Sequence, residues 1–402
     1  MPAHWELKRL KYLCDVQTGD KDTVNADDDG AYPFFVRSQT IERINSFTFN
    51  CEAVLTAGDG VGVGKVFHYF NGKFDFHQRV YMMNNFRFVT GQFFFYYLSS
   101  MFYKVALEGG AKSTVDSLRM PLFLNFDITI PPKSEQSVIV AFLDRETEKI
   151  DTLISQQEKL LTLLAEKRQA TISHAVTRGL VSDMPMKDSG VAWLGDVPAH
   201  WNVVKGSRVG ELFGSEPIPD NEVREDGALP FIKVGSLSLR SFDIESWDWY
   251  VDEAVAAKCS PRRNFIVFPK RGAAIFTNKV NIVKCDALID PNLMGWQIGE
   301  KALAEFIAYV LKVRKLDELA DISTVPQINN KHIGPEKFPI PPVPEQSKIV
   351  EFLDAETTKL DNIEAETSRA IALLKERRSA LIAAAVTGKI DVRNTMPQEL
   401  AA

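Results

Sequence analysis

Two short segments of the sequence approach motifs that bind nucleotides or support catalysis. Residues 58–65 read Gly-Asp-Gly-Val-Gly-Val-Gly-Lys, a mixture of glycines and lysine that is typical of loops whose backbone amides surround a phosphate. A Walker loop would need glycine in place of Asp59 and serine or threonine in place of Val66. The dinucleotide fingerprint would need glycine in place of Lys65. We therefore favour a glycine-rich turn or strand lying close to another backbone segment over a nucleotide site, with close approach to a DNA backbone as a third alternative.

The second segment is a pair of prolines that occurs twice, as Ile130-Pro131-Pro132-Lys133 and Ile340-Pro341-Pro342-Val343. An adenine methyltransferase needs Asn or Asp before such prolines and an aromatic residue after them, and both are missing here. The six histidines are scattered and form no zinc pattern. The sequence therefore predicts that this chain has no catalytic site and no metal site.

Composition limits the class of protein. At 402 residues, with 45% hydrophobic and 25% charged residues, the chain is expected to form two soluble globular domains. It has no apolar run long enough for a membrane span and no apolar signal core at its start. Its cysteines form no CxxC pair and indicate reduced thiols, so we expect a cytoplasmic protein. They are Cys14, Cys51, Cys259 and Cys285.

The net charge of −6 does not favour nucleic-acid binding. The acidic residues are uneven, however, because six aspartates lie close together near the N-terminus with only Lys21 to offset them. Outside this cluster, residues 1–130 carry more Lys and Arg than Asp and Glu, so a local basic surface is compatible with the acidic total. The six are Asp15, Asp20, Asp22, Asp27, Asp28 and Asp29.

An internal repeat determines the expected architecture. The segment 131–144, Pro-Pro-Lys-Ser-Glu-Gln-Ser-Val-Ile-Val-Ala-Phe-Leu-Asp, returns at 341–354 as Pro-Pro-Val-Pro-Glu-Gln-Ser-Lys-Ile-Val-Glu-Phe-Leu-Asp. A second echo, Pro-Ala-His-Trp, stands at 2–5 and at 198–201. The chain is therefore a tandem duplication. Its framework is kept while the stretches between the matched ends differ, as expected for two copies of one domain with different targets.

Each copy ends in a long predicted helix. Residues 134–176 and 345–387 contain neither Pro nor Gly, and Gly179 and Gly388 supply C-terminal stops. Each helix would run about 60–65 Å. Apolar residues recur at steps of three and four, close to a coiled-coil seam, so we expect the two helices to pair in antiparallel fashion; the alternative is that each packs on its own globular domain. The predicted seam consists of Ile139, Leu143, Ile150, Leu153, Leu160, Leu164, Ile349, Leu353, Leu360, Ile363, Ile371 and Leu374.

The predicted fold class is α+β: two similar globular domains joined by two long helices in an antiparallel coiled coil, with a pseudo-two-fold internal repeat. Short aromatic and β-branched runs indicate strands, and residues 91–105 and 300–315 have helical patterns. The aromatic run 93–97 is expected in the core rather than stacked on bases. The expected division is a first globular domain at 1–130, a first spacer helix at 131–180, a linker and second globular domain at 181–340, a second spacer helix at 341–390, and a tail at 391–402.

The doubled Pro-Pro-x-x-Glu-Gln pattern at the start of two long helices resembles the specificity subunit of Type I restriction–modification systems, and the resemblance covers essentially the whole chain. It implies a non-catalytic subunit in which each domain recognises half of a split DNA site. It also implies partners: two adenine methyltransferase subunits, which would bind the S-adenosylmethionine, and a helicase–nuclease restriction subunit. The alternative is a protein-interaction scaffold whose coiled coil acts as a spacer, without DNA recognition.

Base edges and phosphates are contacted mainly by Arg, Lys, Asn, Gln, Ser and Thr. Lys65 and Lys279 are preferred candidates because they hold matching places in the two halves, as do Ser113-Thr114 and Ser323-Thr324, which could instead cap a helix or stabilise the domain–spacer junction. For any single candidate, an ordinary solvated surface residue is the alternative. The predicted DNA-binding residues are Arg37, Ser38, Gln39, Lys65, His77, Gln78, Arg79, Lys112, Ser113, Thr114, Lys233, Ser236, Lys270, Arg271, Lys279, Asn292, Ser323, Thr324 and Gln327.

Overall fold

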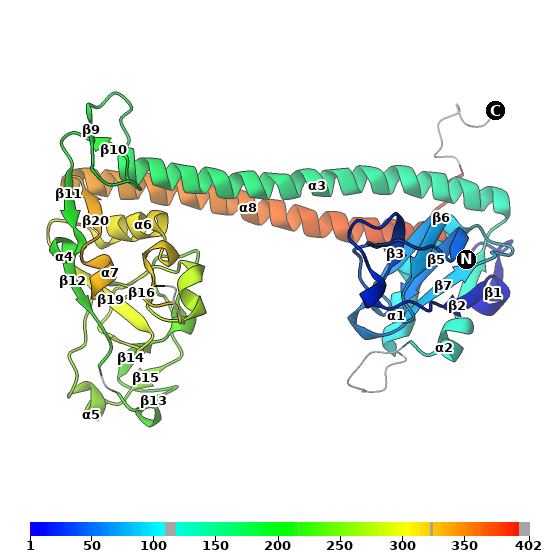
Figure 1. Ribbon diagram of the computed structural model, residues 1–402, viewed down its shortest axis with the longest axis horizontal. Helices are drawn as coiled ribbons and strands as arrows, with labels where there is room; N and C mark the ends of the chain where they lie inside the picture. Colours follow the sequence, from blue (N-terminus) through cyan, green and yellow to red (C-terminus); the bar gives the residue numbers. More distant parts are fainter. Residues whose placement is uncertain (109–117, 217, 322–324, 394–402) are drawn as a thin grey trace. The chain divides into compact units, whose positions relative to one another are not determined.

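The computed structural model describes residues 1–108, 118–216, 218–321 and 325–393 (Figure 1). The chain divides into two compact units: unit 1 comprises Met1–Lys159 and Thr367–Ala402, and unit 2 comprises Leu160–Glu366. Both long helices cross this division. Each unit therefore contains one globular part, one half of the first long helix and one half of the second.

Unit 1 is built on a six-stranded sheet with the order β2-β7-β5-β6-β3-β4, antiparallel except for the β3–β6 pair. A separate two-stranded ladder joins β1 to β8. The strands are β1 (Glu6–Arg9), β2 (Asp15–Thr18), β3 (Tyr32–Phe35), β4 (Glu42–Ile44), β5 (Phe49–Ala57), β6 (Phe67–Phe76), β7 (Val80–Asn84) and β8 (Asp127–Ile130). The helices are α1 (Gly91–Glu108), α2 (Met120–Leu124), the first half of α3 (Lys133–Arg178) and the second half of α8 (Val343–Val386).

Unit 2 repeats this plan with one interruption. Its sheets have the orders β12-β19-β16-β17 and β13-β15-β14-β18, because the counterpart of β6 is broken into β17 and β18. The ladder β11–β20 corresponds to β1–β8, and β9–β10 forms a hairpin. The strands are β9 (Met186–Asp188), β10 (Asp196–Pro198), β11 (Asn202–Lys205), β12 (Gly210–Phe213), β13 (Val223–Arg224), β14 (Leu229–Ile232), β15 (Tyr250–Val251), β16 (Phe265–Pro269), β17 (Asn281–Val283), β18 (Leu288–Ile289), β19 (Leu293–Ile298) and β20 (Lys337–Ile340). The short helices are α4 (Gly206–Val209), α5 (Glu253–Ala256), α6 (Ala304–Arg314) and α7 (Asn330–Ile333).

The sheet of unit 1 is strongly coiled. The partner of Phe74 on β5 is Phe49, at its start, whereas the partner of Val80 is Ala57, at its end. β5 spans about 30 Å if straight, yet only residues 77–79 separate β6 from β7, a connection that reaches about 14 Å. The sheet must therefore curl, which brings the connections between its strands together.

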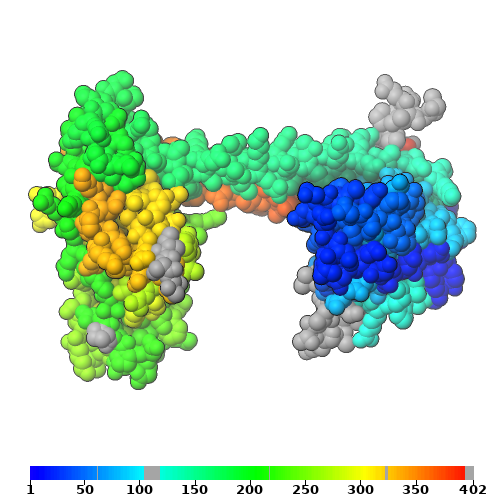
Figure 2. Space-filling view, in the orientation of Figure 1, coloured from blue at the N-terminus to red at the C-terminus, as the bar shows by residue number. Residues whose placement is uncertain are grey.

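Helix α1 packs on β5 and β6, and its aromatic residues fill the core. Phe93 and Phe94 are fully buried, and Tyr96 and Tyr97 nearly so, which confirms the expectation that this run belongs to the core. The globular part of unit 1 forms a closely packed body (blue to cyan in Figure 2). In unit 2, α6 packs in the same way on β16 and β17, with Phe306 and Tyr309 buried.

Both long helices begin directly after their proline pairs and end before glycines with positive φ, Gly179 (+76°) and Gly388 (+67°). Within unit 1 the two helices are antiparallel: the Arg378 guanidinium pairs with Asp151 (2.8 and 3.1 Å), and Lys375 pairs with Glu158 (3.5 Å). Within unit 2, Arg168 pairs with Asp361 in the matching position. The predicted antiparallel pair is confirmed.

The predicted seam needs a correction, because only five of its twelve residues lie on the stripe along which the two helices pack. Leu153 and Ile363 are 44% and 42% exposed and so lie outside the buried stripe. Ile139, Leu143, Ile349 and Leu353 are buried, but in the cores of the globular parts. The helix–helix stripe repeats at steps of four and three, and the same register, shifted by 210 residues, holds in α8. Its members are 150, 154, 157, 161, 164, 168, 171 and 175 in α3, and 360, 364, 367, 371, 374, 378, 381 and 385 in α8.

The physical reason for this error is that polar residues occupy several positions of the stripe. Gln157, Arg168, Glu364, Thr367 and Arg378 are all buried or half-buried there. A search for apolar residues alone skips Glu364 and selects the neighbouring Ile363. Leu153 has a different neighbour, because the stripe position beside it is the apolar Ile154, which is 9% exposed. Leu160, Leu164 and Leu374 are half-buried, whereas Ile150, Leu360 and Ile371 are buried as expected.

Candidate nucleic-acid interface

Three connections of unit 1 meet at one edge of the coiled sheet. The amide of His77 donates to the carbonyl of Phe35 at the end of β3 (2.9 Å), and the amide of Gly58 donates to the carbonyl of Arg79 (2.8 Å). These bonds tie the three segments into one continuous surface, which we call surface A. It consists of residues 36–41, 58–66 and 77–79.

The glycines of surface A allow backbone segments to approach closely. Gly60, at the start of the 3₁₀ turn Gly60–Gly62, has φ +76°. A Cβ on Gly62 would lie 2.5 Å from the carbonyl oxygen of Arg37. The expectation that residues 58–65 form a glycine-rich turn against another backbone is therefore confirmed, and the turn ends close to Arg37.

An ion-pair cluster lies in the middle of surface A. Nη1 of Arg37 donates to Asp59 at 2.8 Å, and Nη1 of Arg79 lies 3.4 Å from the other oxygen of the same carboxylate. The side chain of Asp59 is 23% exposed, and those of Arg37 and Arg79 are 40% and 56% exposed. The carboxylate therefore holds two solvent-facing guanidinium groups side by side. Sequence reasoning selected both arginines but missed Asp59, because only the fold brings residues 37, 59 and 79 together.

Polar residues surround this cluster. Gln39 donates to the backbone carbonyl of Lys65 (2.9 Å), and Nε2 of His68 bonds to the carbonyl of Ser38 (2.9 Å). Burial lowers the pKa of His68, although the bond to Ser38 opposes this shift. Ser38, Gln39 and Lys65 are exposed and line one side of surface A. Gln78 is exposed on the other side, where it donates to Asp22 (2.6 Å).

His77 does not fit the prediction that it contacts DNA. It is 3% exposed, and its Nδ1 accepts a hydrogen bond from the backbone amide of Arg79 (2.9 Å). Burial lowers its pKa, with the nearby carboxylate of Asp22 opposing the shift. His77 therefore stabilises the connection between β6 and β7 as a buried, neutral side chain, whereas its neighbours Gln78 and Arg79 face solvent.

The same backbone frame is present in unit 2, in a surface that we call surface B. It consists of residues 233–236, 270–279, 290–292 and 325–327. Gly272, the counterpart of Gly60, has φ +72°. Three backbone hydrogen bonds of unit 1 have counterparts in unit 2. Gly58 N to Arg79 O (2.8 Å) corresponds to Lys270 N to Asn292 O (2.8 Å), and His77 N to Phe35 O (2.9 Å) corresponds to Asp290 N to Ile232 O (2.9 Å). The third, Leu118 N to Gly58 O (2.9 Å), corresponds to Ile328 N to Lys270 O (2.8 Å).

The side chains on this common frame differ at four matched positions, whereas Gly60 and Gly272 are the same residue. An acidic residue of surface A is replaced by a basic one in surface B, and an arginine is replaced by an asparagine. The matched pairs are Gly58 and Lys270, Asp59 and Arg271, His77 and Asp290, and Arg79 and Asn292. The two units thus present different sets of hydrogen-bonding groups from one shape of backbone.

Surface B carries adjacent cations at the end of β16. Arg271 is exposed, and Lys270 is half-buried. Burial lowers the pKa of Lys270, and the neighbouring Arg271 adds to this effect while Asp290 opposes it. Gln327 is exposed and pairs with Arg271 through a backbone bridge, so the structure brings these predicted residues together.

Asn292 is held in a fixed orientation next to these cations. Its Nδ2 donates to Oδ1 of Asp290 (2.8 Å), which also accepts from the backbone amide of Asn292 (2.7 Å). A fixed carboxamide or guanidinium can form paired hydrogen bonds with a base edge, and lysines next to it can contact phosphates. Surfaces A and B therefore have the chemistry needed for DNA recognition.

The remaining predicted residues are more scattered. Lys233 follows β14 and lies over the ring of Trp249 (3.7 Å), and Ser236 ends the 3₁₀ turn Val234–Ser236, half-buried. Lys279 is half-buried two residues before β17, as the exposed Lys65 is before β6. The other five predicted residues lie outside the described part of the chain. They are Lys112, Ser113, Thr114, Ser323 and Thr324.

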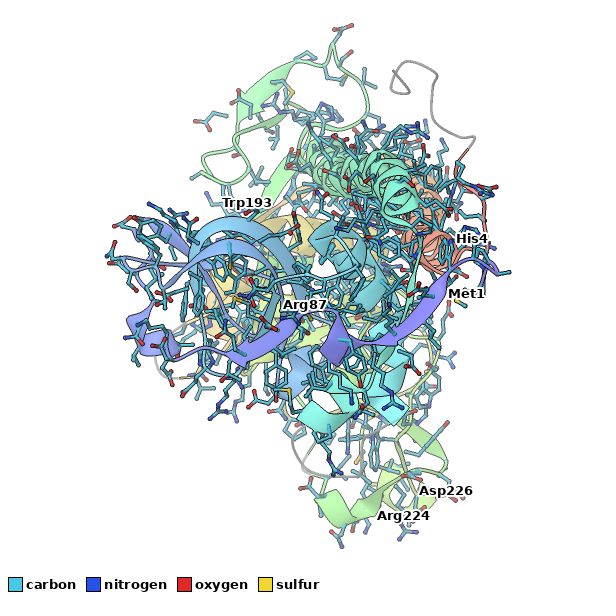
Figure 3. All side chains as sticks on the ribbon, turned by 90° about the vertical axis from the view of Figure 1, so that its right-hand side faces the viewer. Met1, His4, Arg87, Trp193, Arg224 and Asp226 are labelled. Atoms are coloured by element: carbon cyan, nitrogen blue, oxygen red, sulfur yellow. The ribbon has the colours of Figure 1, made fainter. Side chains whose placement is uncertain are left out.

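The repeated sequence motifs make the same contacts in both units. In unit 1, Glu135 at the start of α3 accepts from the indole of Trp5 (3.0 Å) and bonds to His4 (2.7 Å; labelled in Figure 3). In unit 2, Glu345 bonds to Trp201 (3.0 Å) and His200 (2.7 Å) in the same way. The Pro-Ala-His-Trp and Glu-Gln repeats therefore fasten the first residues of each half to the start of a long helix.

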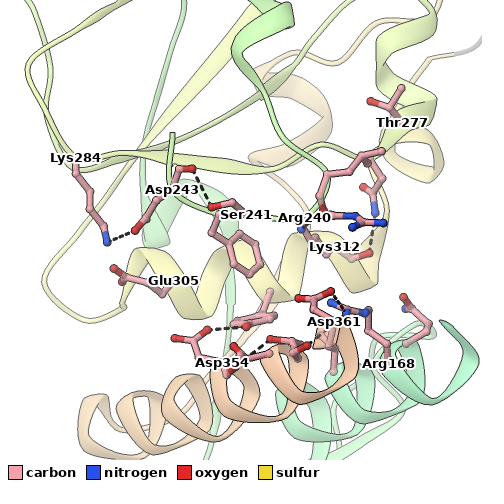
Figure 4. Close-up of a pocket in the computed structure, with 18 residues that line it drawn as sticks. Arg168, Arg240, Ser241, Asp243, Thr277, Lys284, Glu305, Lys312, Asp354 and Asp361 are labelled. Carbon is pink, nitrogen blue, oxygen red and sulfur yellow. Dashed lines mark hydrogen bonds and ion pairs between the residues drawn. The ribbon is translucent and has the colours of Figure 1, made fainter. Parts of the chain in front are cut away.

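A polar cavity of about 450 Å³ lies in unit 2 between α6 and the two long helices (Figure 4). Several of its polar groups are paired: Lys284 pairs with Asp243 (2.6 Å), and the hydroxyl of Tyr309 donates to Asp354 (2.7 Å). Burial lowers the pKa of Lys312 to about 8, and its amine donates to the carbonyl of Leu239 (3.1 Å). This arrangement is that of a solvated, ion-paired wall rather than of an activated nucleophile.

Among the described residues, no three His, Cys, Asp or Glu side chains are grouped so as to hold a metal ion. Over the same ranges, no helix has both the length and the apolar character required to cross a bilayer.

The chain matches a known protein family over most of its length. Residues 2–163 and 198–372 both match the Type I restriction modification DNA specificity domain. The chain is similar to the Type I restriction enzyme EcoDI specificity subunit of Escherichia coli, with 26% identity over 97% of this chain and 89% of that protein. It is also similar to the Type I restriction enzyme MjaVIII specificity subunit of Methanocaldococcus jannaschii, with 22% identity over 98% of this chain and 95% of the relative.

Solved structures share the fold. A chain from a study of the complex assembly and conformational transition of the type I R-M system aligns with a TM-score of 0.75 and 15% identity, covering 97% of this chain and 99% of that chain. The HsdS subunit from Thermoanaerobacter tengcongensis aligns with a TM-score of 0.56 and 16% identity, covering 97% and 98%. The predicted fold class, with its two similar globular parts and paired long helices, is thereby confirmed.

Proposed function

Because the chain belongs to the Type I restriction modification DNA specificity family, we propose that surface A and surface B each recognise one half of a split DNA sequence. The chain is a non-catalytic specificity subunit that recognises a DNA target in a complex with other subunits. The family implies DNA, methyltransferase and restriction partners. S-adenosylmethionine would bind the methyltransferase, and we place the complex in the cytoplasm.

One observation carries the assignment of the two surfaces. Three matched backbone hydrogen bonds and a matched positive-φ glycine define the same frame in both units, yet the exposed side chains on that frame differ. A merely structural surface would have no reason to keep the frame and exchange Asp59 for Arg271. Two duplicated domains that recognise different base sequences would share the backbone frame and differ in these side chains.

The experiment that tests this function uses the chain reconstituted with its methyltransferase partner. Duplexes would be selected from a random DNA pool and sequenced. We expect an enriched motif with two specified parts separated by an unspecified gap. The scaffold alternative predicts no enriched sequence and no DNA affinity beyond that of the methyltransferase alone.

We further propose that two methyltransferase copies bind the long helices at equivalent places. Leu153 of α3 and Leu373 of α8 are exposed in unit 1, and Leu163 and Ile363 are exposed in unit 2, with exposures between 42% and 56%. Leu153 corresponds to Ile363, and Leu163 to Leu373, under the repeat. Large apolar side chains at repeated exposed positions are typical of protein interfaces, and their duplication supports two identical partners.

The variant Leu153→Asp/Ile363→Asp tests this stoichiometry. Both side chains are exposed, so we expect the helix pair to unfold at the wild-type temperature. Binding of the methyltransferase should fall by about tenfold or more at each place, because buried apolar area is lost and a charge is desolvated. Mass measurement of the complex should show one methyltransferase copy with L153D alone and none with both substitutions.

The matched control is Ile150→Asp/Leu360→Asp, which puts charges on buried seam positions, 6% and 4% exposed. That variant should lose helical structure itself. If L153D/I363D retains two methyltransferase copies at wild-type affinity, these side chains are not the docking positions.

A further inference from the structure

A carboxylate in each surface binds the neighbouring side chain that is best suited to recognise a base. In surface A, Asp59 holds Arg79 through Nη1 (3.4 Å) and Arg37 through Nη1 (2.8 Å). In surface B, Asp290 holds Asn292 through Nδ2 (2.8 Å). Arg79 and Asn292 occupy the same backbone position. The carbonyl of each accepts a hydrogen bond from the amide of the first residue after a matched strand, Gly58 after β5 and Lys270 after β16.

The two acids come from different connections. Asp59 lies in the connection after β5, whereas Asp290 lies two residues before Asn292, in the connection before β19. The counterpart of Asp59 in surface B is Arg271, and the counterpart of Asp290 in surface A is His77. The units therefore reach the same arrangement, an acid beside the exposed side chain, by different residues.

The remaining hydrogen-bonding groups determine which base each side chain suits. The ion pair of Arg79 uses Nη1, which leaves Nε and Nη2 directed elsewhere, and a guanidinium fork matches O6 and N7 of guanine. Asn292 uses one hydrogen of Nδ2 for Asp290, which leaves the other hydrogen and Oδ1. That donor–acceptor pair matches N7 and N6 of adenine.

Resting on the proposed function, we infer that Arg79 recognises a guanine in one half-site and Asn292 an adenine in the other, and that Asp59 and Asp290 are their positioning residues. Fixing a long side chain in advance reduces the entropy lost on binding. The carboxylate of Asp59 also repels phosphates, so it weakens binding to every DNA by the same amount and leaves sequence preference to the guanine contact.

The variant Asp59→Asn separates positioning from charge. It removes a negative charge from a DNA-binding surface, so binding of the complex to random DNA should stay the same or become tighter. Preference for guanine at one position of one half-site should fall by about tenfold, the order of one paired base contact. The other half-site should keep its sequence.

A second variant, Arg79→Lys, keeps the charge but removes the fork, and it should relax the same single position. Asn292→Ala should relax one A·T position in the opposite half-site. The readout is the methylated motif and the relative methylation rate at each variant position, with thermal unfolding as the folding control. Should D59N fail to fold, R79K decides the question alone.

The inference is overturned if D59N and R79K both keep wild-type preference at every position, if the relaxed position is not a G·C pair, or if R79K and N292A affect the same half-site. These results are distinguishable from failure of the proposed function, because if that function were wrong the wild-type complex itself would methylate no split motif.

Discussion

Replacing Gln136 by alanine is expected to destabilise unit 1 by about 3 kcal/mol, and Gln346→Ala should destabilise unit 2 equally. Gln136 is fully buried. Its Oε1 accepts from the amide of Thr90 (2.8 Å), and its Nε2 donates to the carbonyls of Phe88 and Pro131 (both 2.9 Å). Truncation leaves one buried and two part-buried backbone groups without these partners, each with a desolvation cost.

The matching residue in unit 2 makes the same three bonds. Gln346 accepts from the amide of Leu303 (2.7 Å) and donates to the carbonyls of Lys301 (3.1 Å) and Pro341 (2.8 Å). Chemical unfolding of both variants gives the measurement. The control Gln169→Ala, at an exposed position of α3, should change stability by less than about 0.5 kcal/mol. If the buried variants behave like this control, these glutamines are not structural anchors.

The second large effect is expected on DNA binding. The variant Lys270→Ala/Arg271→Ala should weaken binding of the methyltransferase complex to its target by about a hundredfold, since one phosphate contact and one base contact are lost. The slope of log affinity against log salt should become shallower by about one for each phosphate contact removed. Assembly with the methyltransferase should be unchanged, because the proposed docking positions are on the long helices and include neither residue.

Titration of DNA into the complex at several salt concentrations measures both quantities. Lys301→Ala removes an exposed lysine from the connection between β19 and α6 and serves as the control for lost positive charge. Wild-type affinity and salt slope in the double variant would remove Lys270 and Arg271 from the DNA interface.

Much of the architecture could be predicted because the duplication preserves it. The Pro-Pro-x-x-Glu-Gln and Pro-Ala-His-Trp repeats mark the starts of the long helices and of the matched strands β1 and β11. The structure shows the bonds that join them, from Trp5 to Glu135 and from Trp201 to Glu345. The absence of Pro and Gly over more than 40 residues predicted both long helices. Both features are short segments of consecutive residues, so they can be recognised without knowing which distant residues they contact.

The seam register could not be predicted from apolar residues alone. Arg168 and Arg378 occupy seam positions because Asp361 and Asp151 on the facing helix neutralise them, and this pairing is visible only once the helices are aligned. The same limit applies to surface A. His77 has polar neighbours in sequence and is nevertheless buried, whereas Asp59 becomes important through arginines 22 and 20 residues away.

The most direct test of the central claim is a map of methylated adenines in whole genomes, from cells that express the partner methyltransferase with and without this chain. We predict a split motif that appears only when the chain is present. An unchanged methylation pattern, in cells where the chain and the methyltransferase demonstrably form a complex, would contradict DNA recognition and favour the scaffold.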